Sequence, residues 1–159
     1  MGSPFPSVPF PFPLTPLASG VTHCHHRIVL NPKLEFVIIV NPNSGPGSEP
    51  WWPNADYVRQ TPALAVHPNV QVVGYVSTDY CNRPMEQVLK DVNQYAGWSQ
   101  DNRFRGLAVS GIFFDETPNV FSEKAKDFLD TITRHVKATH GIMGSKMVIL
   151  QLFATIETG

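Results

Sequence analysis

The chain has 159 residues, of which 42% are hydrophobic, and its 12 lysines and arginines against 13 aspartates and glutamates give a net charge of −1. This length and composition predict about one globular domain and exclude disordered tails and collagen-like chains. The near-neutral charge gives no electrostatic reason to expect nucleic acid or an anionic membrane as a partner. The longest apolar run, residues 36–40, is far shorter than the roughly 20 residues of a membrane-spanning helix.

Ten of the 15 prolines lie in the first fifty positions, and residues 1–16 alternate largely between proline and phenylalanine. Because proline lacks an amide donor and fixes φ, this stretch is expected to form neither a helix nor a strand. No basic residue precedes Arg27 and the prolines interrupt the apolar run, so the segment does not have the pattern of a secretory signal peptide. We therefore divide the chain into an irregular segment, 1–30, and a folded domain, 31–159.

Four apolar runs predict buried strands, because they are short, rich in β-branched or aromatic residues and followed by polar loops. We expect these strands to be parallel and adjacent in chain order, at residues 35–40, 70–76, 107–114 and 147–152. Apolar residues at three- and four-residue spacing predict helices between the strands, near 84–95 and 121–136, with Gly141 placed to end the second. A less regular helix is expected at 55–66, broken at Pro62, with Thr61 capping a second short turn.

Strand, loop and helix repeated about every 35 residues predict an α/β fold with a parallel sheet. A doubly wound sheet would join its first strand to a helix by a Gly-rich phosphate turn. The first loop here, 41–54, contains four prolines instead, which favours the long loops of a (β/α)8 TIM barrel. Four βα units make a partial barrel, so we expect open sheet edges and an exposed apolar inner face that promote oligomerisation.

Two adjacent carboxylates, Asp115 and Glu116, follow the third predicted strand. Barrel enzymes hold catalytic groups at this end of their strands, and glycoside hydrolysis commonly needs a pair of carboxylates. Successive strand residues point to opposite faces, so both can reach one pocket only if the strand ends or curls, and Pro118 favours an ending. The alternative is that one carboxylate caps the next helix and the other is solvated.

Five further residues end the first two strands or lie in the loop after the second, and each has a binding and a structural interpretation. Asn41 can bind sugar hydroxyls or form a turn before Pro42. A tyrosine offers a sugar an apolar face and a hydroxyl, and an aspartate can pair with an amino sugar's cation. The candidates for substrate binding are Asn41, Tyr75, Asp79, Tyr80 and Arg83. In the structural alternatives, Tyr75 fills the barrel interior, and Asp79 forms an ion pair with Arg83 within the loop.

Two other features are weaker candidates. Trp51 and Trp52 can stack on a sugar, although we favour a role in clamping the loop to the rim. Residues 23–26 read His-Cys-His-His, but consecutive side chains on an extended chain point to opposite sides and do not converge as metal ligands do. We expect no metal and no cofactor.

The segments LEFVIIVNPNSGPG, ADYVR, HPNVQVVGYVSTDY, YAGW and GIFFDETP, with Arg83-Pro84 after the third, together resemble the spherulin-4-like family (spherulation-specific family 4) over roughly residues 31–144. The resemblance implies a (β/α)8 barrel, an extracellular location and a glycoside hydrolase acting on galactosamine-containing polysaccharide. It also aligns Asp115 and Glu116 with the family's acidic catalytic pair.

This sequence differs from the family at both ends: the Pro/Phe segment occupies the place of the first strand and helix, and three further βα units and a third acid are missing. We therefore expect a truncated barrel. The alternatives to a hydrolase are a carbohydrate-binding pseudoenzyme and a non-functional barrel fragment. Another barrel enzyme, such as a phosphosugar isomerase, would need a phosphate site in late loops that this chain does not contain.

Overall fold

The computed structural model describes residues 8–10, 18–47, 53–101, 103 and 105–152. Its centre is a five-stranded sheet in which every neighbouring pair is parallel and the strand order follows the chain, β1-β2-β3-β4-β5. The strands are β1 (Val8–Phe10), β2 (Phe36–Val40), β3 (Val70–Ser77), β4 (Gly111–Thr117) and β5 (Met147–Leu152). The helices are α1 (Ala18–Leu30), α2 (Ala55–Ala65), α3 (Met85–Trp98) and α4 (Glu123–Ala138). The predicted parallel order of the four apolar runs is confirmed.

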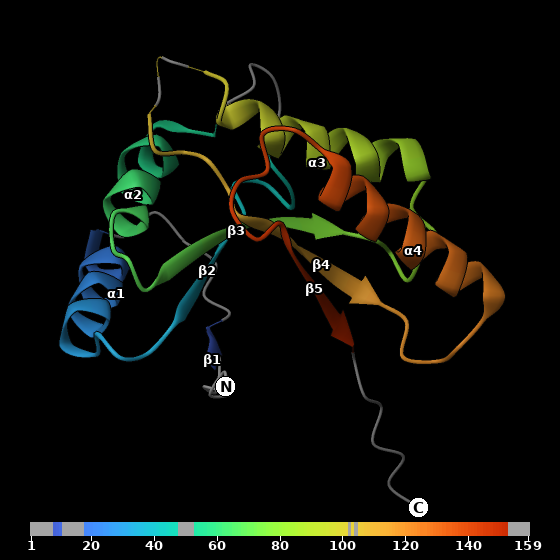
Figure 1. Ribbon diagram of the computed structural model, residues 1–159, viewed down its shortest axis with the longest axis horizontal. Coiled ribbons are helices and arrows are strands. Elements are labelled where there is room, and N and C mark those ends of the chain that lie inside the picture. The colour runs from blue at the N-terminus through green and yellow to red at the C-terminus, as the bar shows by residue number, and fades with distance from the viewer. Residues whose placement is uncertain (1–7, 11–17, 48–52, 102, 104, 153–159) are drawn as a thin grey trace, which may run out of the picture.

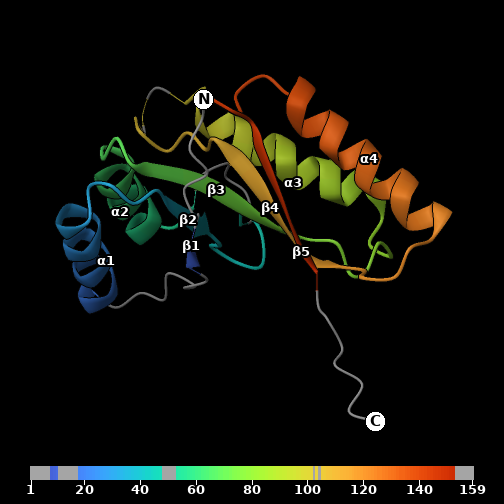
Figure 2. The ribbon, with the colours of Figure 1, turned by 60° about the horizontal axis from the view of Figure 1, so that its bottom comes forward.

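The helices lie on one side of the sheet, α1 and α2 over one half and α3 and α4 over the other (Figures 1 and 2). The strand order produces this arrangement, because right-handed crossovers that always advance to the next strand place every helix on the same side. Every second side chain of a strand then faces the helices. Ile112 and Val76 pack with Tyr95 of α3 and Ile132 of α4 in the larger core cluster. A smaller cluster joins Ile28 of α1 and Leu64 of α2 with Phe36 of β2.

The opposite, inner face of the sheet carries a second apolar cluster of Val37, Ile39, Val73 and Phe113. We expected these side chains to be exposed in a partial barrel, and that expectation is wrong, because none is more than 7% exposed. They pack against one another and against partly buried neighbours on β3 and β5. The inner face is therefore an apolar layer, as in the filled interior of a barrel.

The expectation of an irregular segment at 1–30 is wrong for residues 8–10 and 18–30, while residues 1–7 and 11–17 lie outside the described residues. β1 pairs with β2 from Val8 opposite Phe36 to Phe10 opposite Ile38, and α1 begins at Ala18. Proline is tolerated in a strand at the edge of a sheet, where its missing N–H need not face a partner, and β1 is such a strand. The thirteen residues of α1 contain no proline, so none of them lacks the backbone amide that a helix needs.

The predicted break in the second helix does not occur, because α2 runs from Ala55 through Pro62 to Ala65. Asn54 caps its start, and the side chain of Asn54 accepts from the amides of Asp56 and Tyr57. Pro62 fits beside Gly106, where a Cβ would lie 2.9 Å from the proline ring. Thr61, predicted as a cap, is instead 1% exposed inside the helix. Tertiary packing thus outweighs the local cost of the proline.

The last helix begins two residues later than predicted and ends before Gly141. Ser122 caps α4 by accepting from the Ala125 amide at 3.1 Å, which leaves Phe121 outside the helix and 73% exposed. Gly141, at φ +97°, lies against α3, where a Cβ would meet the Ala96 carbonyl oxygen at 2.3 Å. Among the described residues, no helix is long and apolar enough to cross a membrane.

Candidate active site

The two adjacent carboxylates lie in a β-bulge, because β4 does not end before them but continues to Thr117. Phe114 pairs with Leu150 and Thr117 pairs with Leu152, so Asp115 and Glu116 together occupy the space opposite one residue of β5. Glu116 has φ +56°, in the left-handed region that a residue other than glycine seldom adopts. The bulge breaks the strict alternation of the strand, which is how adjacent side chains come to the same side.

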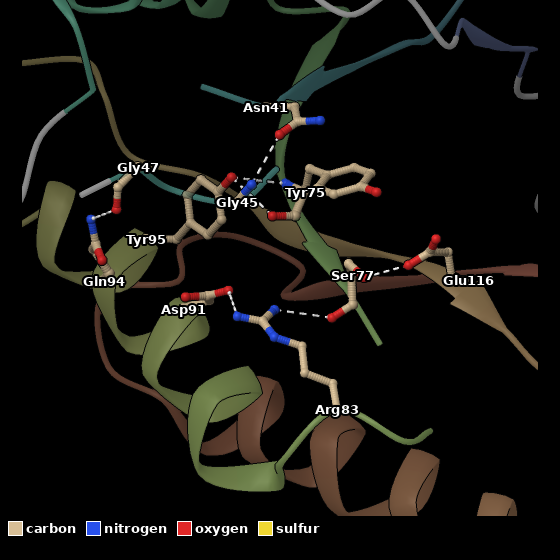
Figure 3. A network of polar contacts seen from close by, with 10 residues as sticks. All are labelled: Asn41, Gly45, Gly47, Tyr75, Ser77, Arg83, Asp91, Gln94, Tyr95 and Glu116. Atoms are coloured by element: carbon tan, nitrogen blue, oxygen red, sulfur yellow. Dashed lines mark hydrogen bonds and ion pairs between the residues drawn. The ribbon is translucent and has the colours of Figure 1, made fainter. Parts of the chain in front are cut away.

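Two hydroxyl groups of β3 hold the two carboxylates. Tyr75 donates to Oδ2 of Asp115 at 2.8 Å. Ser77 donates to Oε2 of Glu116 at 2.5 Å, as Figure 3 shows. Both donors are on the inner face of β3, two residues apart. Asp115 and Glu116 are half-buried, and the first also accepts from the Glu116 amide at 2.7 Å. The pair is thus fixed by hydrogen bonds and still open to solvent on one side.

Tyr95 of α3 fixes the strand ends beneath the carboxylates. Its hydroxyl, wholly buried, lies 2.9 Å from the Val40 carbonyl and 3.0 Å from the Tyr75 carbonyl, and it accepts from the Tyr75 amide at 3.1 Å (Figure 3). The ring crosses Gly74, where a Cβ would lie 2.7 Å from three ring atoms. Glycine is therefore needed at this position for Tyr95 to connect β2 and β3.

Burial raises the pKa of the Tyr75 phenol well above its ordinary value of 10.0, and its hydrogen bond to Asp115 and the charges of Asp115 and Glu116 raise it further. The nearby Arg83 guanidinium lowers it in part. Tyr75 is consequently a neutral hydrogen-bond donor throughout the physiological pH range. Its ring stacks on Phe113 at a centroid distance of 6.1 Å, so it also fills part of the inner face.

Asn41 follows β2 and is engaged locally. Its side-chain oxygen accepts from the Gly45 amide at 3.0 Å, and its carbonyl accepts from the Tyr57 hydroxyl at 2.8 Å. This is the turn-forming role considered from the sequence. Its side-chain nitrogen points away from Gly45 in Figure 3, on the side opposite to the oxygen that the turn uses. A role of Asn41 in binding stays a prediction.

The loop after β3 places the other three candidates differently. Asp79 and Tyr80 are exposed, and both have positive φ, at 47° and 52°. Arg83 instead turns inward, where it donates to the Ser77 carbonyl at 3.1 Å and forms an ion pair with Asp91 of α3 at 2.7 Å (Figure 3). The structural alternative of an Asp79–Arg83 pair is therefore wrong, because Asp91 is the partner of Arg83.

The remaining sequence candidates do not join this site. Trp51 and Trp52 lie outside the described residues. The histidine-rich stretch is helical rather than extended, and within it His25 contacts the ring of His67 at 4.7 Å. Within the described part of the chain, no group of three or more His, Cys, Asp or Glu side chains is arranged to hold a metal ion.

Four further residues belong to this site and were not predicted from the sequence, namely Ser77, Thr78, Asp91 and Tyr95. Ser77 could have been found from the strand period, since it lies two residues after Tyr75 and opposite Asp115. Tyr95 and Asp91 both lie in the helix predicted near 84–95, where Tyr95 fits the apolar stripe and Asp91 was given no role. No local pattern distinguishes them from ordinary helix residues.

Comparison with known proteins gives consistent results. The family model described as spherulation-specific family 4 matches residues 8–152. Spherulin-4 from Physarum polycephalum is 32% identical over 112 residues, which are 70% of this chain and 30% of that protein. A crystal structure of Aspergillus clavatus Sph3 in complex with GalNAc superposes with a TM-score of 0.86 at 35% identity, covering 91% of this chain and 56% of that one.

The chain therefore spans less than two thirds of the length of either relative. The predicted fold class, an α/β fold that forms part of a (β/α)8 barrel, is confirmed by the parallel sheet, its one-sided helices and the superposition. The match to the family model runs from β1 through β5 and thus includes the bulge and its hydroxyl donors. The chain belongs to spherulation-specific family 4.

Proposed function

We propose that this protein binds galactosamine-containing polysaccharide at the carboxyl ends of its strands and that it is a glycoside hydrolase with Asp115 and Glu116 as the catalytic residues. One observation carries the proposal: the bulge in β4 brings two adjacent carboxylates to the same side, each held by a hydroxyl of β3. Cleavage of a glycosidic bond commonly uses two carboxylic groups at such a place.

The two carboxylates have different tasks in this proposal. Glu116 has the longer side chain, and it donates a proton to the glycosidic oxygen as the bond from that oxygen to the anomeric carbon breaks. Asp115, which accepts from both Tyr75 and the Glu116 amide, stabilises the positive charge that develops at the sugar. Water then forms a bond from its oxygen to the anomeric carbon and gives its proton to the Glu116 carboxylate, which restores the acid.

The neighbouring polar groups fit a sugar ligand. Exposed Tyr80, which is 51% exposed, offers a ring face for stacking, and Asp79 beside it offers a charge for an amino group. The amide nitrogen of Asn41 offers a donor for a hydroxyl, whereas Arg83 acts indirectly through Ser77 and Asp91. The relative Sph3 holds GalNAc in its crystal structure, which supports the choice of an amino sugar. An extracellular location is part of this proposal and rests on the resemblance to the family.

The test is hydrolysis of galactosaminogalactan, followed by the appearance of reducing ends. Asp115→Asn and Glu116→Gln keep the shape of each side chain and remove its charge, so each should lower turnover by about 10²-fold or more. Asp127→Asn, an exposed residue of α4, is the matched control and should leave turnover unchanged. Near wild-type hydrolysis by both site variants would assign the pair a structural role.

A carbohydrate-binding protein without hydrolytic activity is the second candidate. It is favoured by the exposed ring of Tyr80 beside the exposed Asp79, which together offer a sugar a binding surface that needs no catalytic group. Such a protein would retain galactosaminogalactan in a pull-down and release no reducing ends. In that case Tyr80→Ala should weaken the retention of galactosaminogalactan. Asp115→Asn should have no effect on the hydrolysis assay, because the wild-type chain already releases no reducing ends.

A further inference from the structure

The bulge that carries the acid pair depends on the segment that follows β3. Two carbonyl groups, those of Asp115 and Glu116, accept from the amides of Thr78 and Tyr80 in this segment. The Thr78 amide donates to the Asp115 carbonyl at 3.0 Å, and the Tyr80 amide donates to the Glu116 carbonyl at 2.7 Å. Buried carbonyl groups need such partners, so this segment takes over the role of the interrupted ladder.

The Thr78 side chain joins the same two carbonyls. Its hydroxyl lies 2.8 Å from the Glu116 carbonyl oxygen and 3.1 Å from that of Asp115, and the residue is fully buried. A hydroxyl has one hydrogen to donate, so the two carbonyls share one donor whose position fixes both. Thr78 contacts the backbone of the acid pair and neither carboxylate.

The chain around Thr78 is held in an unusual conformation. Asp79, Tyr80 and Cys81 have φ values of 47°, 52° and 65°, three consecutive left-handed residues without a glycine. Such a conformation persists only where the surroundings determine it, and such surroundings are frequent at functional sites. Here the Arg83 amide donates to the Thr78 carbonyl at 3.2 Å and the Asn82 amide donates to that of Asp79 at 2.8 Å.

We propose that Thr78 is a positioning residue: its buried hydroxyl holds the two carbonyls of the bulge and thereby directs the carboxylates of Asp115 and Glu116 to the same side. The proposal rests on the catalytic role assigned to that pair above. A carbon in place of the hydroxyl leaves the backbone carbonyls without their shared donor. The bulge then relaxes, and the Glu116 carboxylate loses its alignment with Ser77.

The experiment compares Thr78→Val, which has nearly the same shape and no hydroxyl, with Thr78→Ser, which retains the hydroxyl. In the hydrolysis assay, Thr78→Val should lower kcat by about 10-fold or more with KM nearly unchanged, since misplacement of catalytic groups acts on the reacting complex. Thr78→Ser should have a kcat within about twofold of the wild type, because serine keeps the hydroxyl that donates to the carbonyls of Asp115 and Glu116. Should Thr78→Val not fold, Thr78→Ala replaces it.

Hydrogen exchange of the Tyr80 amide gives a second measurement that requires no activity. This amide donates to the Glu116 carbonyl, so it should exchange faster in Thr78→Val and at the wild-type rate in Thr78→Ser. Unchanged kcat together with unchanged Tyr80 exchange in Thr78→Val would overturn the proposal. If the wild-type chain cleaves no polysaccharide, the hydrolase proposal fails, and the Tyr80 exchange alone decides whether Thr78 holds the bulge.

Discussion

The substitution Tyr95→Phe tests whether one buried hydroxyl connects the strand ends beneath the acid pair. It removes the contacts of this hydroxyl with the Val40 carbonyl and with the amide and carbonyl of Tyr75, and it keeps the ring that lies over Gly74. A buried hydrogen bond contributes about 1 kcal/mol net, and a buried polar group left without a partner costs about 1–3 kcal/mol. Because the hydroxyl both donates and accepts, we expect a loss of about 2–3 kcal/mol in the free energy of unfolding.

Urea denaturation followed by circular dichroism measures this loss as a lower midpoint at an unchanged slope. Tyr80→Phe is the matched control, since its side chain is about half exposed and such surface changes usually stay within about 0.5 kcal/mol. If Tyr95→Phe also stays within about 0.5 kcal/mol of the wild type, the hydrogen bonds of this hydroxyl do not stabilise the connection between β2 and β3.

Three further predictions concern the same fold. Burial raises the pKa of Tyr75 and Tyr95 above 10.0 in the folded chain, so the tyrosines of the unfolded chain ionise first as the pH rises. The free energy of unfolding should therefore fall above about pH 10, and the urea midpoint, which is level below that pH, should fall with it. The fall should be less steep in Tyr95→Phe, which lacks one of the two buried phenols. Gly74→Ala should lower the free energy of unfolding by about 1–3 kcal/mol, because its Cβ meets the Tyr95 ring; an unchanged melting curve would contradict this. Leu152 is 58% exposed on β5, which is an edge strand of the sheet, and should promote association of chains. Gel filtration should then show oligomers that increase with concentration and that Leu152→Lys reduces. A wild-type protein that is monomeric at all concentrations would refute this prediction.

The parallel sheet could be predicted because its signal is local and repeated. Runs such as residues 36–40 and 70–76 are β-branched and buried on both faces, and a helix pattern separates one run from the next. The N-terminal strand could not be predicted in this way, because Pro9 is acceptable only at a sheet edge and an edge is a property of the whole sheet. The continuity of α2 through Pro62 similarly depends on Gly106, 44 residues later in the chain.

The acid pair shows which part of a site is visible in a sequence. Strand alternation alone indicated that Asp115 and Glu116 share a side only if the strand is irregular there, and that requirement follows from geometry. The form of the irregularity cannot be predicted from alternation. The bulge depends on the register of β4 with β5 on one side and on the amide donors of Thr78 and Tyr80 on the other. Thr78 follows β3 directly and resembles any polar turn residue, yet it is fully buried between two carbonyls of another strand. Residue types therefore identify the carboxylates, whereas only the pairing of β3, β4 and β5 identifies the groups that direct them.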